Sequence, residues 1–130
     1  MISYGFTKEV MGTFDQVLEG LPAQLEKEGF GVISKIDIGQ KLREKLGIEF
    51  RKYVILGACN PPLAFKALSA EENIGLMLPC NVIVYEKLGN GKTVVATIRP
   101  SAMMSTIGNP ALTAIAEQVE EKLKRVLDSI

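Results

Sequence analysis

The chain has 130 residues, of which 47% are hydrophobic, and this is enough for one domain with one apolar core. Fifteen Lys and Arg residues balance fifteen Asp and Glu residues, so the overall charge attracts neither nucleic acid nor an anionic membrane surface. Histidine is absent, which excludes Ser-His and Cys-His nucleophile pairs and every His-ligated metal site.

The N-terminal residues and the apolar runs indicate where the protein is expected to work. Residues 1–9 lack the basic segment, apolar run and small-residue cleavage site of a signal peptide. The longest apolar stretches are too short to span a bilayer. We therefore expect residues 1–130 to form one cytoplasmic domain with reduced thiols.

The first half of the chain predicts two strands, each followed by a helix. Residues 2–6 are rich in β-formers, and a capping box at Thr13 and Gln16 opens an amphipathic helix that ends near Gly29. Pro22 is the weak point of this helix. Residues 31–38 alternate as a strand with positions 32, 34, 36 and 38 on one face, and residues 39–47 predict one or two helical turns.

The second half predicts three more strands and two more helices. A β-rich run at 53–56 leads into Cys59, and Asn60 is a good N-cap for a helix over 61–68. Residues 82–85 and 93–98 form a hairpin around a Gly-Asn turn. Residues 101–108 read as an irregular crossing, and the apolar stripe from Leu112 to Leu127 predicts a long helix.

This order, β-α-β-β-β-β-α apart from the short helices, predicts an α+β fold. We expect an antiparallel sheet with the two long helices packed on one face, because each long helix has one apolar stripe to bury.

A doubled motif contains both cysteines of the chain. Residues 57–62 and 78–82 each hold a Cys-Asn pair with proline close by. If the strand that ends at Cys59 pairs antiparallel with the strand that begins at Cys80, both thiols meet at one edge of the sheet. The amides at the start of the following helix would attract anions and lower the pKa of a nearby thiol. We therefore predict a ligand site formed by Cys59, Asn60, Pro61, Cys80 and Asn81.

The same residues resemble a known family. The runs at 53–61 and 74–82, with Ala64, Leu68 and the segment 28–32, are similar to the signature of the family called domain of unknown function 302. The resemblance implies a compact prokaryotic α+β domain, similar in outline to half of the TATA-binding-protein fold and often a homodimer. It implies no established activity, no cofactor and no catalytic residue.

Three functions fit these features. The first is a non-catalytic module that binds a small anionic or soft ligand, with Phe65, Met77 and Tyr85 as apolar walls. In its sharpest version the ligand is a soft metal such as Cu(I), held by Cys59, Cys80 and the thioether of Met103 or its neighbour.

The second function is thiol redox chemistry, with Cys59 as the attacking thiolate and Cys80 as the resolving thiol. The third is a dimeric interaction module in which the motif is structural. The sequence alone leaves these alternatives open.

Overall fold

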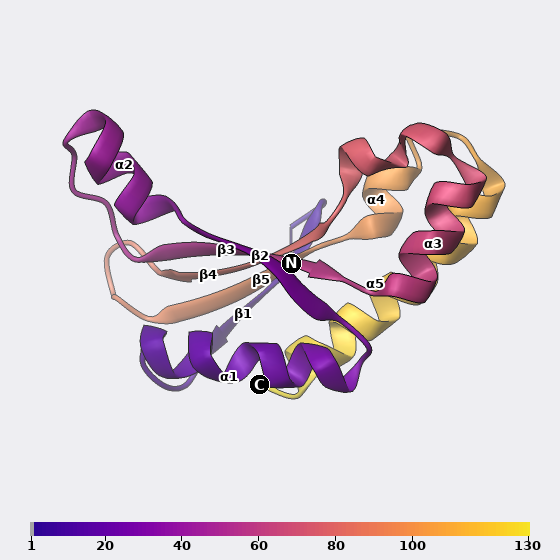
Figure 1. Ribbon diagram of the computed structural model, residues 1–130. Helices are drawn as coiled ribbons and strands as arrows, with labels where there is room; N and C mark the ends of the chain where they lie inside the picture. The colour runs from indigo at the N-terminus through magenta and orange to yellow at the C-terminus, as the bar shows by residue number, and fades with distance from the viewer. Residues whose placement is uncertain (1) are drawn as a thin grey trace.

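The computed structural model describes residues 2–130 as five antiparallel strands and six helical segments (Figure 1). The strands lie in the order β1-β5-β4-β3-β2, with every neighbouring pair antiparallel. The predicted α+β class and antiparallel sheet are therefore confirmed. The five strands are β1 (Gly5–Val10), β2 (Gly31–Asp37), β3 (Tyr53–Cys59), β4 (Cys80–Glu86) and β5 (Thr93–Ile98).

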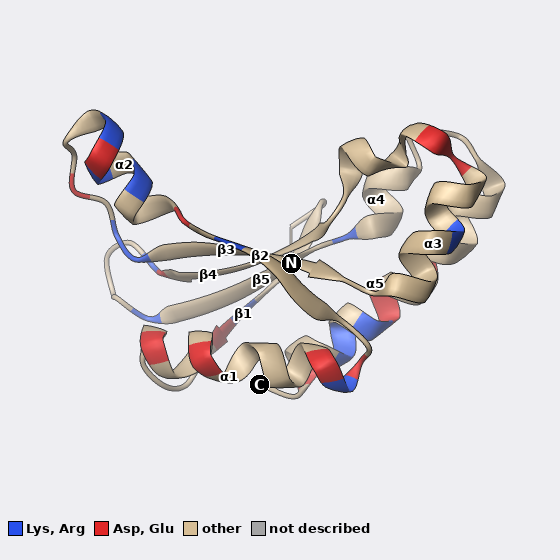
Figure 2. Cartoon of the chain, in the orientation of Figure 1, with Lys and Arg blue, Asp and Glu red and all other residues tan. Residues whose placement is uncertain are grey.

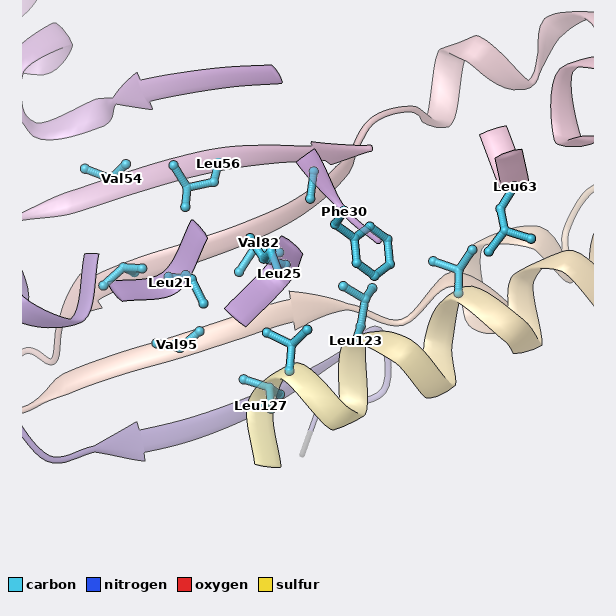
Figure 3. Packing of buried hydrophobic residues seen from close by; sticks show 14 of the residues in the cluster. Leu21, Leu25, Phe30, Val54, Leu56, Leu63, Val82, Val95, Leu123 and Leu127 are labelled. Carbon is cyan, nitrogen blue, oxygen red and sulfur yellow. The ribbon is translucent and has the colours of Figure 1, made fainter. Parts of the chain in front are cut away.

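The two long helices, α1 (Phe14–Lys27) and α5 (Pro110–Asp128), cover one face of the sheet, as predicted (Figure 1). Leu21 and Leu25 of α1 and Leu123 of α5 are fully buried against Val82 and Val95 of the central strands (Figure 3). The apolar surface removed from water here is the main favourable contribution to folding. Among residues 2–130, no helix is both long and apolar enough to cross a bilayer.

Helix α1 begins and ends with the local signals that the sequence contains. The Thr13 side chain accepts from the Gln16 amide, and the Gln16 side chain accepts from the Thr13 amide, which completes the capping box. Gly29, with φ of 84°, ends the helix, and the Phe30 amide turns back to donate to the Leu25 carbonyl at 3.0 Å. This is a Schellman motif, in which the residue after the glycine packs against the helix end.

Strand β2 differs from the simple alternation that the sequence predicts. A bulge lies between Val32 and Ser34. Val32 pairs with Ala58 on the helix-covered side, whereas Ser34 pairs with Gly57, the residue before Ala58, on the other side. The expected shared face of positions 32, 34, 36 and 38 is therefore wrong. A bulge adds one residue to one strand and reverses the side-chain alternation beyond it.

The structure contains two short helical segments that the sequence does not predict. Residues 72–77 form the 3₁₀ helix η1 (Glu72–Met77), and the predicted crossing begins with α4 (Pro100–Met104). The carboxylate of Glu120 on α5 accepts from the Ser101 amide at 3.2 Å and from its hydroxyl at 2.6 Å. The first turn of α4 is thus held by a residue distant in sequence, which local patterns do not reveal.

The second face of the sheet has no long helix over it. Helix α2 (Ile38–Leu46) rises at one end of this face and α3 (Pro61–Ala70) lies beyond the other end (Figure 1). Ile36 of the edge strand β2 is 43% exposed, and Leu46 of α2 is 67% exposed. This side of the molecule therefore presents apolar side chains to solvent.

Gly57 should be intolerant of a side chain, because Ser34 and Pro79 close over it. A Cβ at Gly57 would overlap the Ser34 hydroxyl and lie 2.7 Å from Pro79 Cγ. We expect Gly57→Ala to lower the free energy of unfolding by about 1–3 kcal/mol, measured by urea denaturation. Gly20→Ala is the matched control, because nothing lies within 4 Å of that position. It should stabilise α1 by about 0.5–1 kcal/mol, and equal stability of both variants would contradict the steric argument.

Candidate functional site

The two cysteines meet at one end of the sheet. Strand β3 ends at Cys59 and strand β4 begins at Cys80, and the antiparallel register places Ala58 opposite Cys80. Both thiols are free and partly buried. The predicted pairing of the two strands is confirmed, because antiparallel neighbours bring the end of one strand beside the start of the next.

Both cysteines line one cavity of about 370 Å³. The cavity lies between the end of the sheet, helices α3 and α4, and the first turns of α5. Among residues 2–130 no charged side chain belongs to its wall, and aliphatic side chains form most of it. The wall consists of Phe30, Ile33, Ala58, Cys59, Asn60, Leu63, Ala64, Ala67, Leu68, Gly75, Leu78, Pro79, Cys80, Pro100, Met104, Leu112, Ile115, Ala116 and Val119.

Asn60 is in the cavity wall, but its side chain is occupied by the fold. Its Oδ1 accepts from the Leu63 amide at 3.3 Å, and its Nδ2 donates to the Glu28 carbonyl at 3.4 Å. Asn60 therefore caps the start of α3 and ties it to the end of α1. Its polar atoms already have protein partners.

The start of α3 has no amide to offer an anion. Pro61 and Pro62 occupy the first two helical positions and carry no N–H. The Leu63 amide donates to Asn60 Oδ1, and the Ala64 amide donates to the Asn60 carbonyl at 2.8 Å. The amide positions of residues 61–64 are thus missing or used, and they do not support the expected anion site at this helix start.

The other predicted site residues lie outside the cavity wall. Pro61 and Asn81 are exposed, and Asn81 pairs with Gly57, one position away from the Cys80 pair, so its side chain is on the opposite face. Met104, and not Met103, is in the wall. The expected apolar walls are not there either: Phe65, Met77 and Tyr85 do not line the cavity, and Phe65 is 73% exposed.

Sequence reasoning missed the residues that form most of the cavity. Leu112, Ile115, Ala116 and Val119 belong to the apolar stripe of α5, which the sequence assigns to packing on the sheet. The small residues of α3 were a usable signal, because alanines at helical spacing leave space where larger side chains would fill it.

Burial, and to a smaller extent the nearby thiol of Cys59, together raise the pKa of the Cys80 thiol from its ordinary 9.0 to about 11. Burial disfavours the charged thiolate, since a charge loses its hydration in an apolar surrounding. Cys80 therefore stays protonated at neutral pH, which opposes a role as a thiol that readily closes a disulfide. The raised pKa of Cys80 thus gives the redox hypothesis little support.

The part of the chain that the structure describes contains no group of three or more His, Cys, Asp or Glu side chains placed to hold a metal ion. A metal at the two cysteines would therefore need a different donor. Met104 is the sulfur-containing side chain that shares the cavity wall with them.

Alkylation should report the raised pKa of Cys80 directly. In Cys59→Ser, which removes the smaller Cys59 contribution and keeps burial, the rate of Cys80 modification by iodoacetamide should rise about tenfold per pH unit and continue to rise well above pH 9.0. The same variant unfolded in urea is the control and should level off near the ordinary pKa of 9.0.

The raised pKa of Cys80 should make the free energy of unfolding fall at high pH. Because the folded pKa exceeds the unfolded one, the stabilisation is complete below pH 9.0 and is lost as the pH rises through about 11. A folded-state rate profile that coincides with the unfolded profile would contradict the burial of this thiol.

Comparison with known proteins supports the same assignment of elements. The family model described as "Domain of unknown function DUF302" matches residues 6–130. The crystal structure of the uncharacterized conserved protein DUF302 from Bacillus stearothermophilus is similar to this chain, with a TM-score of 0.89 and 34% sequence identity over 96% of each chain. A search of curated proteins found no significant match. On the strength of the family model and this structure, the chain belongs to the DUF302 family.

Proposed function

We propose that the protein is a non-catalytic binding module whose cavity holds a small, uncharged and largely apolar molecule. The observation that carries this proposal is the cavity of about 370 Å³ with a wall of uncharged, mostly aliphatic side chains. This volume falls in the range typical of small-molecule sites, roughly 300–1,000 Å³. A ligand would gain mainly from removal of its apolar surface from water.

The absence of free polar partners at the site determines the character of the ligand. The amide of Asn60 is bonded to Glu28 and Leu63, and the first amides of α3 are missing or used. A charged ligand would lose its hydration without gaining compensating hydrogen bonds. We therefore replace the small anionic ligand of the sequence hypothesis by an uncharged one.

A soft metal is the second candidate, because Cys59, Cys80 and Met104, three residues that carry sulfur, belong to the wall of the same cavity. This donor set suits Cu(I) better than zinc, which takes four nitrogen, oxygen or thiolate ligands. Metal binding must displace the thiol protons, and the raised pKa of Cys80 opposes this step. We therefore favour an uncharged apolar ligand over a soft metal as the occupant of the cavity.

We also propose that two copies associate through the side of the sheet that the long helices leave uncovered. Helix α2 has nine residues, and its one fully buried residue is Gly39. A helix this short depends on packing of its apolar face, yet Leu46 and the following Ile48 are 67% and 45% exposed. A second copy would cover both side chains, in line with the homodimer that the family resemblance implies.

Filling the cavity should abolish ligand binding while leaving the fold intact. Ala64 is partly buried on α3 and lines the cavity, so Ala64→Phe places a ring in the ligand space. We expect a loss of affinity on the order of tenfold or more for the neutral fluorescent probe phenylnaphthylamine. Ala114→Phe is the matched control, because Ala114 is exposed on α5 and outside the wall. Unchanged binding in Ala64→Phe, at unchanged thermal stability, would refute the cavity as the site.

Charge placed on α2 should separate the two copies. We expect Leu46→Glu to convert a dimer into monomers in native mass spectrometry, because the carboxylate would lose its hydration at the interface. Met11→Glu serves as control, since Met11 is 96% exposed in the turn between β1 and α1. A monomeric wild-type protein at micromolar concentration would end the dimer proposal without affecting the cavity.

A further inference from the structure

We infer that the ligand is an uncharged single-chain amphiphile, such as a long-chain alcohol or aldehyde. This inference rests on the apolar site proposed above. The alkyl chain of the ligand would lie along α5 inside the cavity, and its uncharged polar head would remain at the opening beside Ile33 and Leu68.

The shape of the wall favours a chain over a compact ring. The cavity-lining residues of α5 are Leu112 and the residues three, four and seven positions after it, Ile115, Ala116 and Val119, which share one helix face. They make a stripe about 10 Å long, given a rise of about 1.5 Å per residue. At one end of the wall Phe30 closes the space between the sheet and α5 (Figure 3). An extended hydrocarbon can contact the whole stripe, whereas a compact molecule would leave part of it unfilled.

The opening of the cavity lies on apolar surface. Ile33 and Leu68 line the cavity and are also 65% and 45% exposed, so they stand where the cavity meets solvent. Gly75 lines the cavity too, and the next residue, Leu76, is 90% exposed. A chain longer than the cavity would therefore continue over apolar side chains.

The charges around this opening argue against an ionised head group. Residues 53–85 contain one lysine, Lys66, and two glutamates, Glu71 and Glu72, for a net charge of −1, and residues 100–116 contain no charged residue. Figure 2 shows the lobe formed by α3 and α4 as nearly free of acidic and basic residues. A carboxylate head would meet an apolar rim and a small excess of negative charge.

Two of the charged groups adjoining the lobe, Arg99 and Glu71, interact with groups of the protein itself. Arg99, next to the wall residue Pro100, has its Nε 3.7 Å from Glu120 Oε1. Glu71 accepts from Asn109 Nδ2 at 3.4 Å. Lys66 is exposed on α3 and does not belong to the cavity wall. Among residues 2–130, no charged side chain in the cavity wall serves as a counter-ion for a carboxylate or an ammonium head group. An uncharged head group needs no counter-ion.

The inference is tested by displacement of phenylnaphthylamine from the full chain with ligands that differ in length or in head group. Decanol should displace the probe at a concentration about fifteenfold lower than octanol, because each of its two additional buried methylenes contributes about fourfold in affinity. At about pH 8 decanoate and decylammonium should each bind at least tenfold more weakly than decanol, because an ionised head is costly against an apolar rim.

A cation introduced at the rim should change the preference for the head group. We expect Leu68→Lys to bring the affinity for decanoate to within about threefold of that for decanol, since the new ammonium can pair with the carboxylate. Ala70→Lys is the matched control on the same helix, because Ala70 is exposed and outside the wall. It should leave the ratio unchanged.

The outcomes separate this inference from the proposed function. Probe binding that Ala64→Phe abolishes, together with equal affinities for octanol and decanol, would overturn the chain while retaining the cavity. Equal binding of decanol and either charged analogue would overturn the uncharged head group. Failure of the probe to bind the wild-type protein at all would remove the proposed function itself.

Discussion

The pairing of β3 with β4 is the interaction on which the rest of the structure depends. Its register places Ala58 opposite Cys80 at one end and Tyr53 opposite Tyr85 at the other, where the two rings stack with centroids 5.3 Å apart. A slip of one residue would turn every side chain of a strand to the other face. A slip of β4 would turn Cys80 away from the cavity and would remove Val82 and Val84 from the core.

The cavity exists because the helical lobe extends past the end of the sheet. The main core lies between the sheet and the two long helices, and a second apolar cluster, which includes Ala67, Met104 and Ala116, lies beyond the strand ends. Where the two clusters meet, alanines of α3 and α5 face each other across a gap that larger side chains would fill. Small residues at a boundary between two cores thus leave a cavity.

Helices α3 and α5, which border the cavity, both begin with an asparagine followed by proline. This start leaves few free amide donors at their N-termini. Asn60 precedes two prolines at the start of α3, and Asn109 precedes Pro110 at the start of α5. In each case the asparagine side chain accepts from an amide of the first turn, and proline removes a donor. Helix N-termini usually attract anions, but here the donors are missing or used, so the adjoining space suits uncharged molecules.

The sequence by itself determined the local elements and the antiparallel pairing of the two strands that carry the cysteines. The capping box at Thr13, the glycine at the end of α1, the Asn-Pro helix starts and the apolar stripe of α5 are short-range signals, and each stabilises the same local structure in isolation and in the fold.

The tertiary structure decided the bulge in β2, the first turn of α4 held by Glu120, and which of the predicted site residues reach the cavity. Asn60 and Asn81 look alike in sequence, yet one caps a helix beside the cavity and the other is exposed on the opposite face of the sheet. The physical reason is that an empty space is a property of several surfaces together. Neither the residues that line it nor those that seal it are neighbours in the chain.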